Sequence, residues 1–464
     1  MRIHSALYFI SIVLFVFSIA SLLVVFCCLN YKLNFLPFFS AFIFSVFLSS
    51  ALYFANKNIE IKFDIKSSIY AVFMSWPILI LMGSIPLFIL YPQMNFMDLL
   101  MISTSFSTTT GSWIHLDINI TNEFLIWQST LQWLGGLLTI ILATSFVEYL
   151  FAPYIKNKNI LDFSSFKIVF VIYLSLTFFF VSIFYFLNLP ISDCFKLAMS
   201  LISTSNIIDS YETSEFVNYN NEIMVAKIFG MFLGSLSVSL HYKAFKNGIN
   251  TYLKDKSVII FILLCIFSYF LLSIFSDLKY FENFLINKVF IIFSMISTTG
   301  YIPFEKSIVE HFSSLIFFFI LLTLVGGSTC STAGGIKISR LSSVVNYMFV
   351  ELYHLAHPRE ILSKERWVKS EQISLISLSI IIYIFIIFVF SLFYTLIDLD
   401  FKDSIFIVIS LITNSGIGLL ELVSIQYYPD SNIEAIVAIL VMLFGRIEAI
   451  LVMMFFSSIF WLES

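Results

Sequence analysis

The sequence predicts an all-α membrane protein that crosses the bilayer many times, with ten transmembrane helices and four re-entrant pore loops. Three observations lead to this fold class. The chain is 59% hydrophobic and only 12% charged, long apolar runs recur along it, and shorter apolar runs with similar ends lie between several of them. Soluble domains carry about 25% charged residues, so this composition places the chain in lipid. The five cysteines show no paired spacing, which indicates neither a disulfide framework nor a zinc site.

Runs of about 20 apolar residues are long enough to span a bilayer. The first run is about 23 residues long, which exceeds the apolar core of a signal peptide and predicts a spanning helix. The predicted spans are residues 6–28, 35–55, 68–91, 124–150, 166–188, 221–241, 257–276, 310–336, 371–397 and 433–460.

Four shorter apolar runs lie between these spans, at 97–109, 192–204, 286–298 and 402–413. They are too short to cross about 30 Å of hydrocarbon at about 1.5 Å per residue. We interpret them as re-entrant half-helices, and amphipathic surface helices are the alternative.

Basic residues are distributed unevenly between the two sides of the membrane that ten spans define. The connections on one side (56–67, 151–167, 242–256 and 337–370), together with Arg2, hold thirteen lysines and four arginines, whereas the other side holds six lysines and no arginine. By the positive-inside rule, both termini are expected to be cytoplasmic and the short runs to enter from the outer face. Acidic residues on that face would concentrate cations, although ordinary solvated loops explain them equally simply.

The four short runs end alike, in hydroxyl residues followed by Gly or Asn. The ends read Ser107-Thr108-Thr109-Thr110-Gly111, Ile202-Ser203-Thr204-Ser205-Asn206, Ile296-Ser297-Thr298-Thr299-Gly300 and Ile412-Thr413-Asn414-Ser415-Gly416. Thirteen residues before each end stands an Asp or Asn, residue types that favour helix N-caps: Asp98, Asp193, Asn287 and Asp403. The sequence therefore predicts a fourfold repeat of a capped half-helix and a polar loop.

Such a repeat has the properties of an ion filter. The C-terminal end of a half-buried helix carries a partial negative charge of about −0.5, which favours a cation. Irregular backbone at membrane depth is tolerated only where it lines a cavity. Four loops could then present rings of carbonyl oxygens that replace the water shell of an ion.

Together with other motifs, these segments resemble the Trk/Ktr/HKT superfamily of potassium transporters, and its bacterial TrkH branch in particular. The matching segments, besides the four loops, are Gln132-Trp133-Leu134-Gly135-Gly136, Leu240-His241-Tyr242 with Ala244-Phe245, the run from Gly326 to Lys337, His357-Pro358-Arg359, and the run from Met442 to Glu448. The resemblance covers essentially the whole length.

The resemblance implies a layout of two leading helices and four pore repeats in pseudo-fourfold symmetry. The expected boundaries are 1–60 for the leading helices, then 61–160, 161–250, 251–345 (with a broken second helix) and 346–464 for the repeats. It also implies potassium uptake across a bacterial inner membrane, a homodimer, and a cytoplasmic nucleotide-binding RCK (TrkA-like) subunit. Neither an enzymatic activity nor a covalently bound cofactor is expected, and K⁺ would be the transported ion.

The resemblance assigns K⁺ binding to the ends of the four loops. The expected filter residues are Thr109, Thr110, Gly111, Thr204, Ser205, Asn206, Thr298, Thr299, Gly300, Asn414, Ser415 and Gly416. Asn206 departs from the usual Gly, and Asn is one of the few other residues that tolerate a left-handed backbone. The filter is therefore expected to hold and, with Gly at the other three positions, to favour potassium over sodium; a less selective K⁺/Na⁺ pathway is the alternative.

The span 310–336 is interrupted by Gly326-Gly327 and Gly334-Gly335, with hydroxyl residues between them. Glycines destabilise a helix by about 1 kcal/mol each, so the sequence predicts a break, which the resemblance interprets as a gating loop. A close-packed helix interface is the alternative. Arg446 lies inside the last span, where the resemblance has it contact this loop and oppose ion passage; a structural pair with Glu448 or a carbonyl is the alternative.

Some residues keep two interpretations, and the sequence also bears on two other function classes. Lys227 could snorkel or lie near the second loop, and His241 is expected to be structural. Five basic residues are candidates for docking the RCK subunit, and the alternative is that they only set the membrane topology: Lys243, Lys246, Lys337, Arg340 and Arg359. A sodium- or proton-coupled secondary transporter would explain one broken helix but not four repeats. A membrane-embedded enzyme is not indicated, because the sequence contains no H-E-x-x-H motif, no P-loop and no paired intramembrane carboxylates.

Overall fold

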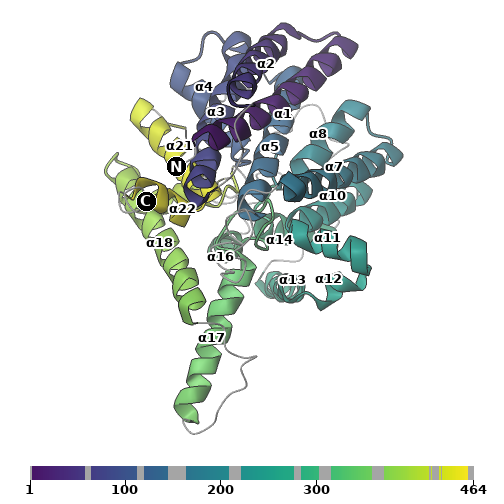
Figure 1. The fold of residues 1–464 in the computed structure, drawn as a ribbon. Helices are drawn as coiled ribbons and strands as arrows, with labels where there is room; N and C mark the ends of the chain where they lie inside the picture. Colours follow the sequence, from purple (N-terminus) through teal and green to yellow (C-terminus); the bar gives the residue numbers. More distant parts are fainter. Residues whose placement is uncertain are drawn as a thin grey trace.

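The computed structural model describes residues 3–57, 64–111, 120–144, 163–207, 221–275, 284–302, 315–357, 370–416, 420, 428–429 and 431–457. All the regular elements in these ranges are helices, and they radiate from a common centre (Figure 1). Seven of them are long and apolar enough to cross a membrane, or eight if one bent pair counts as a span. The prediction of an all-helical, multi-pass fold is therefore confirmed.

The first two helices, α1 (Ile3–Asn30) and α2 (Leu36–Asn56), pack along each other and against α3. After them, the same order recurs four times: a helix, a short helix, and a second helix or pair of helices. The first two recurrences are α3 (Ile65–Leu90), α4 (Phe96–Ser107) and α5 (Asn122–Leu142), followed by α7 (Phe163–Phe186), α8 (Ile191–Ile202), α10 (Asn221–Gly234), α11 (Val238–Asn247) and α12 (Asn250–Lys254). The last two are α13 (Lys256–Phe275), α14 (Phe284–Ile296), α16 (Ile316–Val325) and α17 (Ile338–Ala356), followed by α18 (Ser370–Thr395), α19 (Phe401–Ile412), α21 (Asn432–Ile447) and α22 (Ala449–Phe456).

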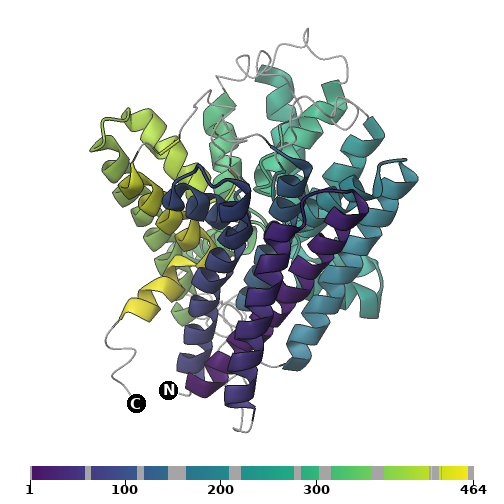
Figure 2. The same cartoon turned by 90° about the horizontal axis from the view of Figure 1, so that it is seen from above.

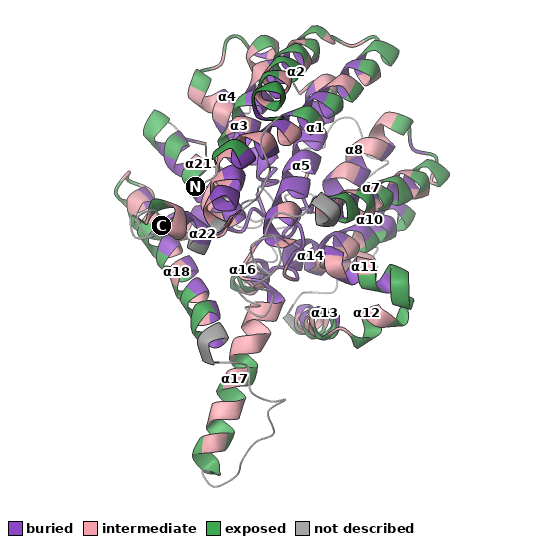
Figure 3. Ribbon diagram, in the orientation of Figure 1, coloured by how far each residue is buried: buried purple, intermediate pink, exposed green. Residues whose placement is uncertain are grey.

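The packing of these groups is cyclic. Each short helix contacts the helix before it: α4 on α3, α8 on α7, α14 on α13 and α19 on α18. Each second helix also contacts the short helix of the next group: α5 on α8, α10 on α14, α16 on α19 and, closing the circle, α21 on α4. The four groups thus surround one centre, which is also where the buried residues gather, while exposed residues lie around the perimeter (Figure 3).

The four short helices agree closely with the predicted half-helices, but their N-caps do not. The N-cap positions of α4, α8 and α19 are Asn95, Pro190 and Asp400. The predicted caps Asp98, Asp193 and Asp403 instead lie in the first turn, and Asn287 lies inside α14. A carboxylate in the first turn lies near the positive end of the helix dipole, so Asp stabilises the helix from this position as well.

Three predicted spans are not continuous helices. Residues 221–241 form α10 and α11, which meet at an angle of 98°. The span 310–336 contains the ten-residue α16, which ends where irregular backbone begins at Gly326. The last span divides into α21 and α22 at Glu448, whose φ is 67°. In Figure 2 the start of α1 and the end of α22 lie towards the same end of the molecule.

Candidate ion pathway

The backbone after each short helix turns in the same way. The residue two positions after the helix has a positive φ in all four cases, which is uncommon outside glycine. The values are 60° at Thr109, 49° at Thr204, 57° at Thr298 and 53° at Asn414. Four unrelated loops would not share this turn, so the repeat seen in the sequence is a repeat in backbone conformation.

The next residue in each segment donates its N–H to the carbonyl of a serine five positions earlier. The four bonds are Thr110 to Ser105 (2.8 Å), Ser205 to Ser200 (2.9 Å), Thr299 to Ser294 (3.0 Å) and Ser415 to Ser410 (3.2 Å). These bonds fix each segment on the C-terminal end of its own helix. The partial negative charge of four helix ends is thereby directed at one place.

The structure brings the four segments together. Asn414 in the fourth donates from Nδ2 to Oγ1 of Thr110 in the first, at 2.9 Å. A Cβ placed on Gly111 would lie 2.5 Å from the carbonyl oxygen of Asn206 in the second, and Nδ2 of Asn206 donates to the carbonyl of Gly300 in the third, at 3.0 Å. The third and fourth segments both meet Gly334, at Thr298 and Thr413.

The side chains of these segments are polar, uncharged and almost fully buried. Thr109, Thr110, Ser205, Thr299 and Ser415 are each at most 1% exposed. Glycines on the surrounding helices permit this close packing: a Cβ on Gly135 would overlap the carbonyl of Ser107, and one on Gly445 the carbonyl of Ile412. An uncharged, buried cluster of backbone and hydroxyl oxygens suits a cation that sheds its water.

The segment between α16 and α17 lies directly against this cluster. Gly334 donates its N–H to Thr298 Oγ1 at 2.7 Å, and Oγ1 of Thr332 donates to the carbonyls of Ile202 (2.9 Å) and Gly234 (3.0 Å). The segment therefore contacts the bases of the second, third and fourth filter segments directly.

The same segment closes on itself at its glycine pairs. Ile336 and Lys337 donate their N–H groups back to Leu324 and Val325 at 2.9 and 3.0 Å. Gly326, with φ 68°, allows no Cβ, because the carbonyl of Gly334 occupies that position. Gly327 packs beside Ala333. The predicted break is thus an ordered, buried loop, and the alternative of two closely packed continuous helices does not describe it.

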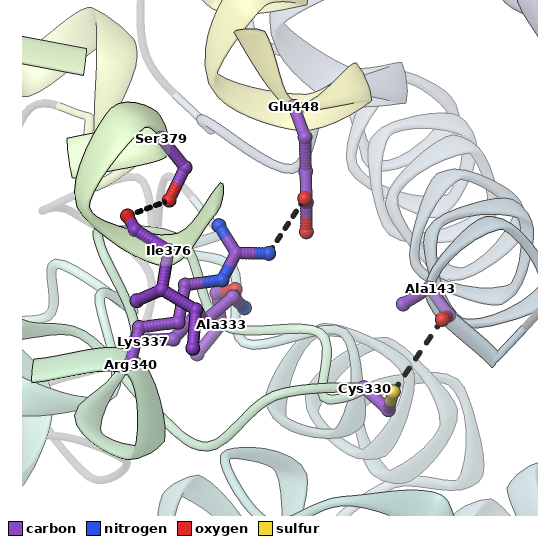
Figure 4. A network of polar contacts seen from close by, with 8 residues as sticks. All are labelled: Ala143, Cys330, Ala333, Lys337, Arg340, Ile376, Ser379 and Glu448. Carbon is purple, nitrogen blue, oxygen red and sulfur yellow. Dashed lines mark hydrogen bonds and ion pairs between the residues drawn. The ribbon is translucent and has the colours of Figure 1, made fainter. Parts of the chain in front are cut away.

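Arg446 reaches this loop from α21. It is 3% exposed, and its Nη1 donates to the carbonyl of Thr332 at 2.6 Å. Of the two structural alternatives, pairing with Glu448 is not observed, since the Glu448 carboxylate binds Arg340 of α17 at 2.6 Å (Figure 4). A bond to a carbonyl is observed, and that carbonyl belongs to the loop. A pocket beside this ion pair is lined by Arg340 and Glu448 and also by Arg446 and Lys337.

Two of the basic residues predicted to dock a partner bind other groups of this chain. Lys337 is buried and donates to the carbonyl of Ala333, and Arg340 is held by Glu448. Both lie where the loop enters α17, and their side chains are bound within the chain. Lys243 and Lys246 of α11 are exposed, and Arg359 lies outside the described residues.

The structure also places the two residues left open by the sequence. Lys227 is 2% exposed, and its Nζ lies 4.7 Å from the ring centroid of Tyr301, the residue after Gly300. It thus lies behind the filter segments instead of snorkelling. His241 contacts the Tyr252 hydroxyl at 2.7 Å and the Leu233 carbonyl at 3.1 Å, which ties α11 to its neighbours.

Sequence reasoning missed Gln128 as a functional candidate and used Gln132 only as part of a motif. Both side chains of α5 are fully buried, and both donate from Nε2 to the carbonyl of Asn206, at 3.1 and 2.8 Å. Two amides four residues apart share one helix face. Two glutamines with this spacing inside an apolar span are visible in the sequence and could have marked both residues as functional candidates.

Comparison with known proteins agrees with this geometry. No family model matches the chain. An uncharacterised cation transporter of Methanocaldococcus jannaschii is 25% identical over 87% of the chain and 84% of its own length. The potassium uptake protein TrkI of Halomonas elongata is 23% identical over 84% and 82%, and TrkH of Vibrio parahaemolyticus is 24% identical over 99% and 100%.

The crystal structure of the Vibrio parahaemolyticus potassium transporter TrkH superposes with a TM-score of 0.84, covering 99% of this chain and 100% of that one at 22% identity. These relatives are named as transporters or uptake proteins. The chain thus has the fold of TrkH, and its sequence is similar over nearly its whole length to the TrkH and TrkG potassium uptake proteins.

Proposed function

We propose that the chain takes up potassium across a bacterial inner membrane through the centre of the four filter segments. The observation that carries the proposal is the shared turn of these segments and their mutual contacts, from Thr110 through Asn206 and Gly300 to Asn414. The twelve filter residues predicted from the sequence are proposed to line the K⁺ pathway, where backbone carbonyls supply most of the ligands. The relatives named as potassium uptake proteins support the choice of ion.

The loop from Gly326 to Gly335 is proposed as the gate, with Arg446 as its cationic latch. The loop contacts three filter segments, and Arg446 anchors it through Thr332. A buried guanidinium opposes a cation in the same low-dielectric space. Outward movement of the loop would remove both the obstruction and the charge.

A cytoplasmic RCK subunit and a second copy of the chain are proposed partners, and both termini are proposed to be cytoplasmic. Helix α17 continues directly from the gating loop and projects from the rest of the molecule (Figure 1), so force applied to it would reach the loop. Exposed Lys243 and Lys246 lie on α11. Co-purification of an RCK protein that is lost when both lysines are neutralised would support docking there.

Ion flux into liposomes tests the proposed function. Purified protein reconstituted with a K⁺ gradient directed into the liposomes should carry K⁺ down that gradient without stoichiometric movement of Na⁺ or H⁺, because a filter needs no coupled ion. Empty liposomes and an equal Na⁺ gradient are the controls. Flux that requires a fixed ratio of Na⁺ or H⁺ to K⁺ would support the coupled secondary transporter instead.

A further inference from the structure

The second filter segment departs from the other three at its end. Gly111, Gly300 and Gly416 have φ values of 70°, 75° and 66°, whereas Asn206 is not among the described residues with positive φ. The expectation that Asn206 would copy the left-handed turn of glycine is therefore not met. The backbone of the second segment therefore departs from that of the other three at this residue.

The hydroxyl groups of the second segment differ as well. In the other three segments, hydroxyls two residues apart bond each other: Thr108 with Thr110 (2.8 Å), Ser297 with Thr299 (2.7 Å) and Thr413 with Ser415 (2.9 Å). In the second, Ser203 bonds the carbonyls of Met199 and Ser200, and the buried Oγ of Ser205 has no hydrogen-bond partner in the described structure.

The Asn206 carbonyl is saturated with hydrogen bonds. A carbonyl oxygen has two lone pairs, and here Nε2 of Gln128 and Nε2 of Gln132 take both, at 3.1 and 2.8 Å. The amide nitrogens must be the atoms that face it, because an amide oxygen in the same place would repel the carbonyl. Two donors beside this oxygen also oppose the approach of a cation.

The Asn206 side chain extends the same network to the next segment. Its Nδ2 donates to the carbonyl of Gly300 at 3.0 Å and occupies one of that oxygen's lone pairs. The Gly416 carbonyl likewise accepts one bond, from Ser410 Oγ at 2.7 Å. Gly300 and Gly416 therefore keep one lone pair each for an ion, and Asn206 keeps none.

We propose that Gln128, Gln132 and Asn206 form an amide clamp that withdraws the second segment from the outer ring of ion ligands and thereby weakens discrimination of K⁺ against Na⁺. The inference rests on the proposed function. With Asn206 withdrawn, the ring holds three available carbonyls, those of Gly111, Gly300 and Gly416. The number of coordinating carbonyl dipoles is one determinant of preference for K⁺, and a missing ligand can be replaced by water, which Na⁺ accepts readily.

The test compares K⁺/Na⁺ permeability ratios of reconstituted variants of the full chain. Gln128→Met with Gln132→Met keeps side-chain volume and removes both donors, and Asn206→Gly restores the residue found in the other three segments. Each is expected to raise the ratio by about five-fold, the effect of one recovered ligand contact. Both changes act on the carbonyl of residue 206, the first by removing its two donors and the second by allowing the left-handed turn of glycine. The combined variant should therefore raise the ratio by less than the product of the two separate effects.

Ser129→Ala is the matched control, since Ser129 is buried on the same helix and its Oγ bonds only the Ile126 carbonyl, at 2.9 Å. It should leave the ratio unchanged. If the double variant does not fold, Gln132→Met alone removes the shorter bond and should still raise the ratio. An unchanged or lowered ratio with intact K⁺ flux overturns the clamp while the proposed function stands; absence of flux in the unmodified protein overturns the proposed function itself.

Discussion

Replacing Arg446 by Met is expected to raise basal K⁺ flux by about ten-fold, the change that corresponds to about 1.4 kcal/mol of barrier. The guanidinium is 3% exposed and holds the loop through one 2.6 Å bond to Thr332. Its removal takes away a buried positive charge and releases the loop from α21. The measurement is K⁺ flux into liposomes that contain the chain without any regulatory subunit.

Arg446→Lys is the control for charge alone, because it keeps the positive charge and loses the forked guanidinium geometry. Flux close to that of the unmodified protein is expected. If Arg446→Met leaves flux unchanged while the variant folds normally, Arg446 has a purely structural role and the gate must lie elsewhere.

Gly135→Ala is expected to abolish the stably folded protein. The added methyl would overlap the backbone carbonyl of Ser107, which cannot move without displacing the first filter segment. Overpacking typically costs about 1–3 kcal/mol where side chains can yield, and a rigid backbone contact costs at least as much. Melting temperature and monodispersity in detergent would measure the loss.

Gly230→Ala provides the comparison on α10. Its nearest neighbours are side-chain atoms of Leu201, at 3.0 Å and beyond, which can shift. We expect a melting temperature within a few degrees of the unmodified protein for a change of about 1 kcal/mol or less. Equal behaviour of the two alanine variants would contradict the tight contact between α5 and the first segment.

The half-helices could be predicted because each is an apolar run too short to span the bilayer that ends in polar residues. The expected runs 97–109 and 402–413 correspond to α4 (Phe96–Ser107) and α19 (Phe401–Ile412). Their caps could not be placed, because Asp is favourable both at the N-cap and in the first turn. A fixed offset between Asp and filter does not distinguish the two positions.

Breaks in spans were predicted only where glycines cluster. The pairs around Gly326 and Gly334 revealed the loop, whereas the 98° bend after Gly234 and the break at Glu448 escaped a search based on average hydropathy. Hydropathy sums over a window and does not register one residue with an unusual φ. The side-chain partners of Arg446 and Glu448 come from different helices, so no local pattern contains them.

Locating a heavy potassium analogue in the protein tests the central claim most directly. Rb⁺ replaces K⁺ closely, and its anomalous scattering in crystals marks bound ions. The account predicts peaks in a line between the four segments, surrounded by Thr110, Ser205, Thr299 and Ser415 and lying on the outer side of Gly334. Peaks confined to the broken helix between Gly326 and Gly335, with none among the filter segments, would contradict it and favour a transporter with its binding site in that break.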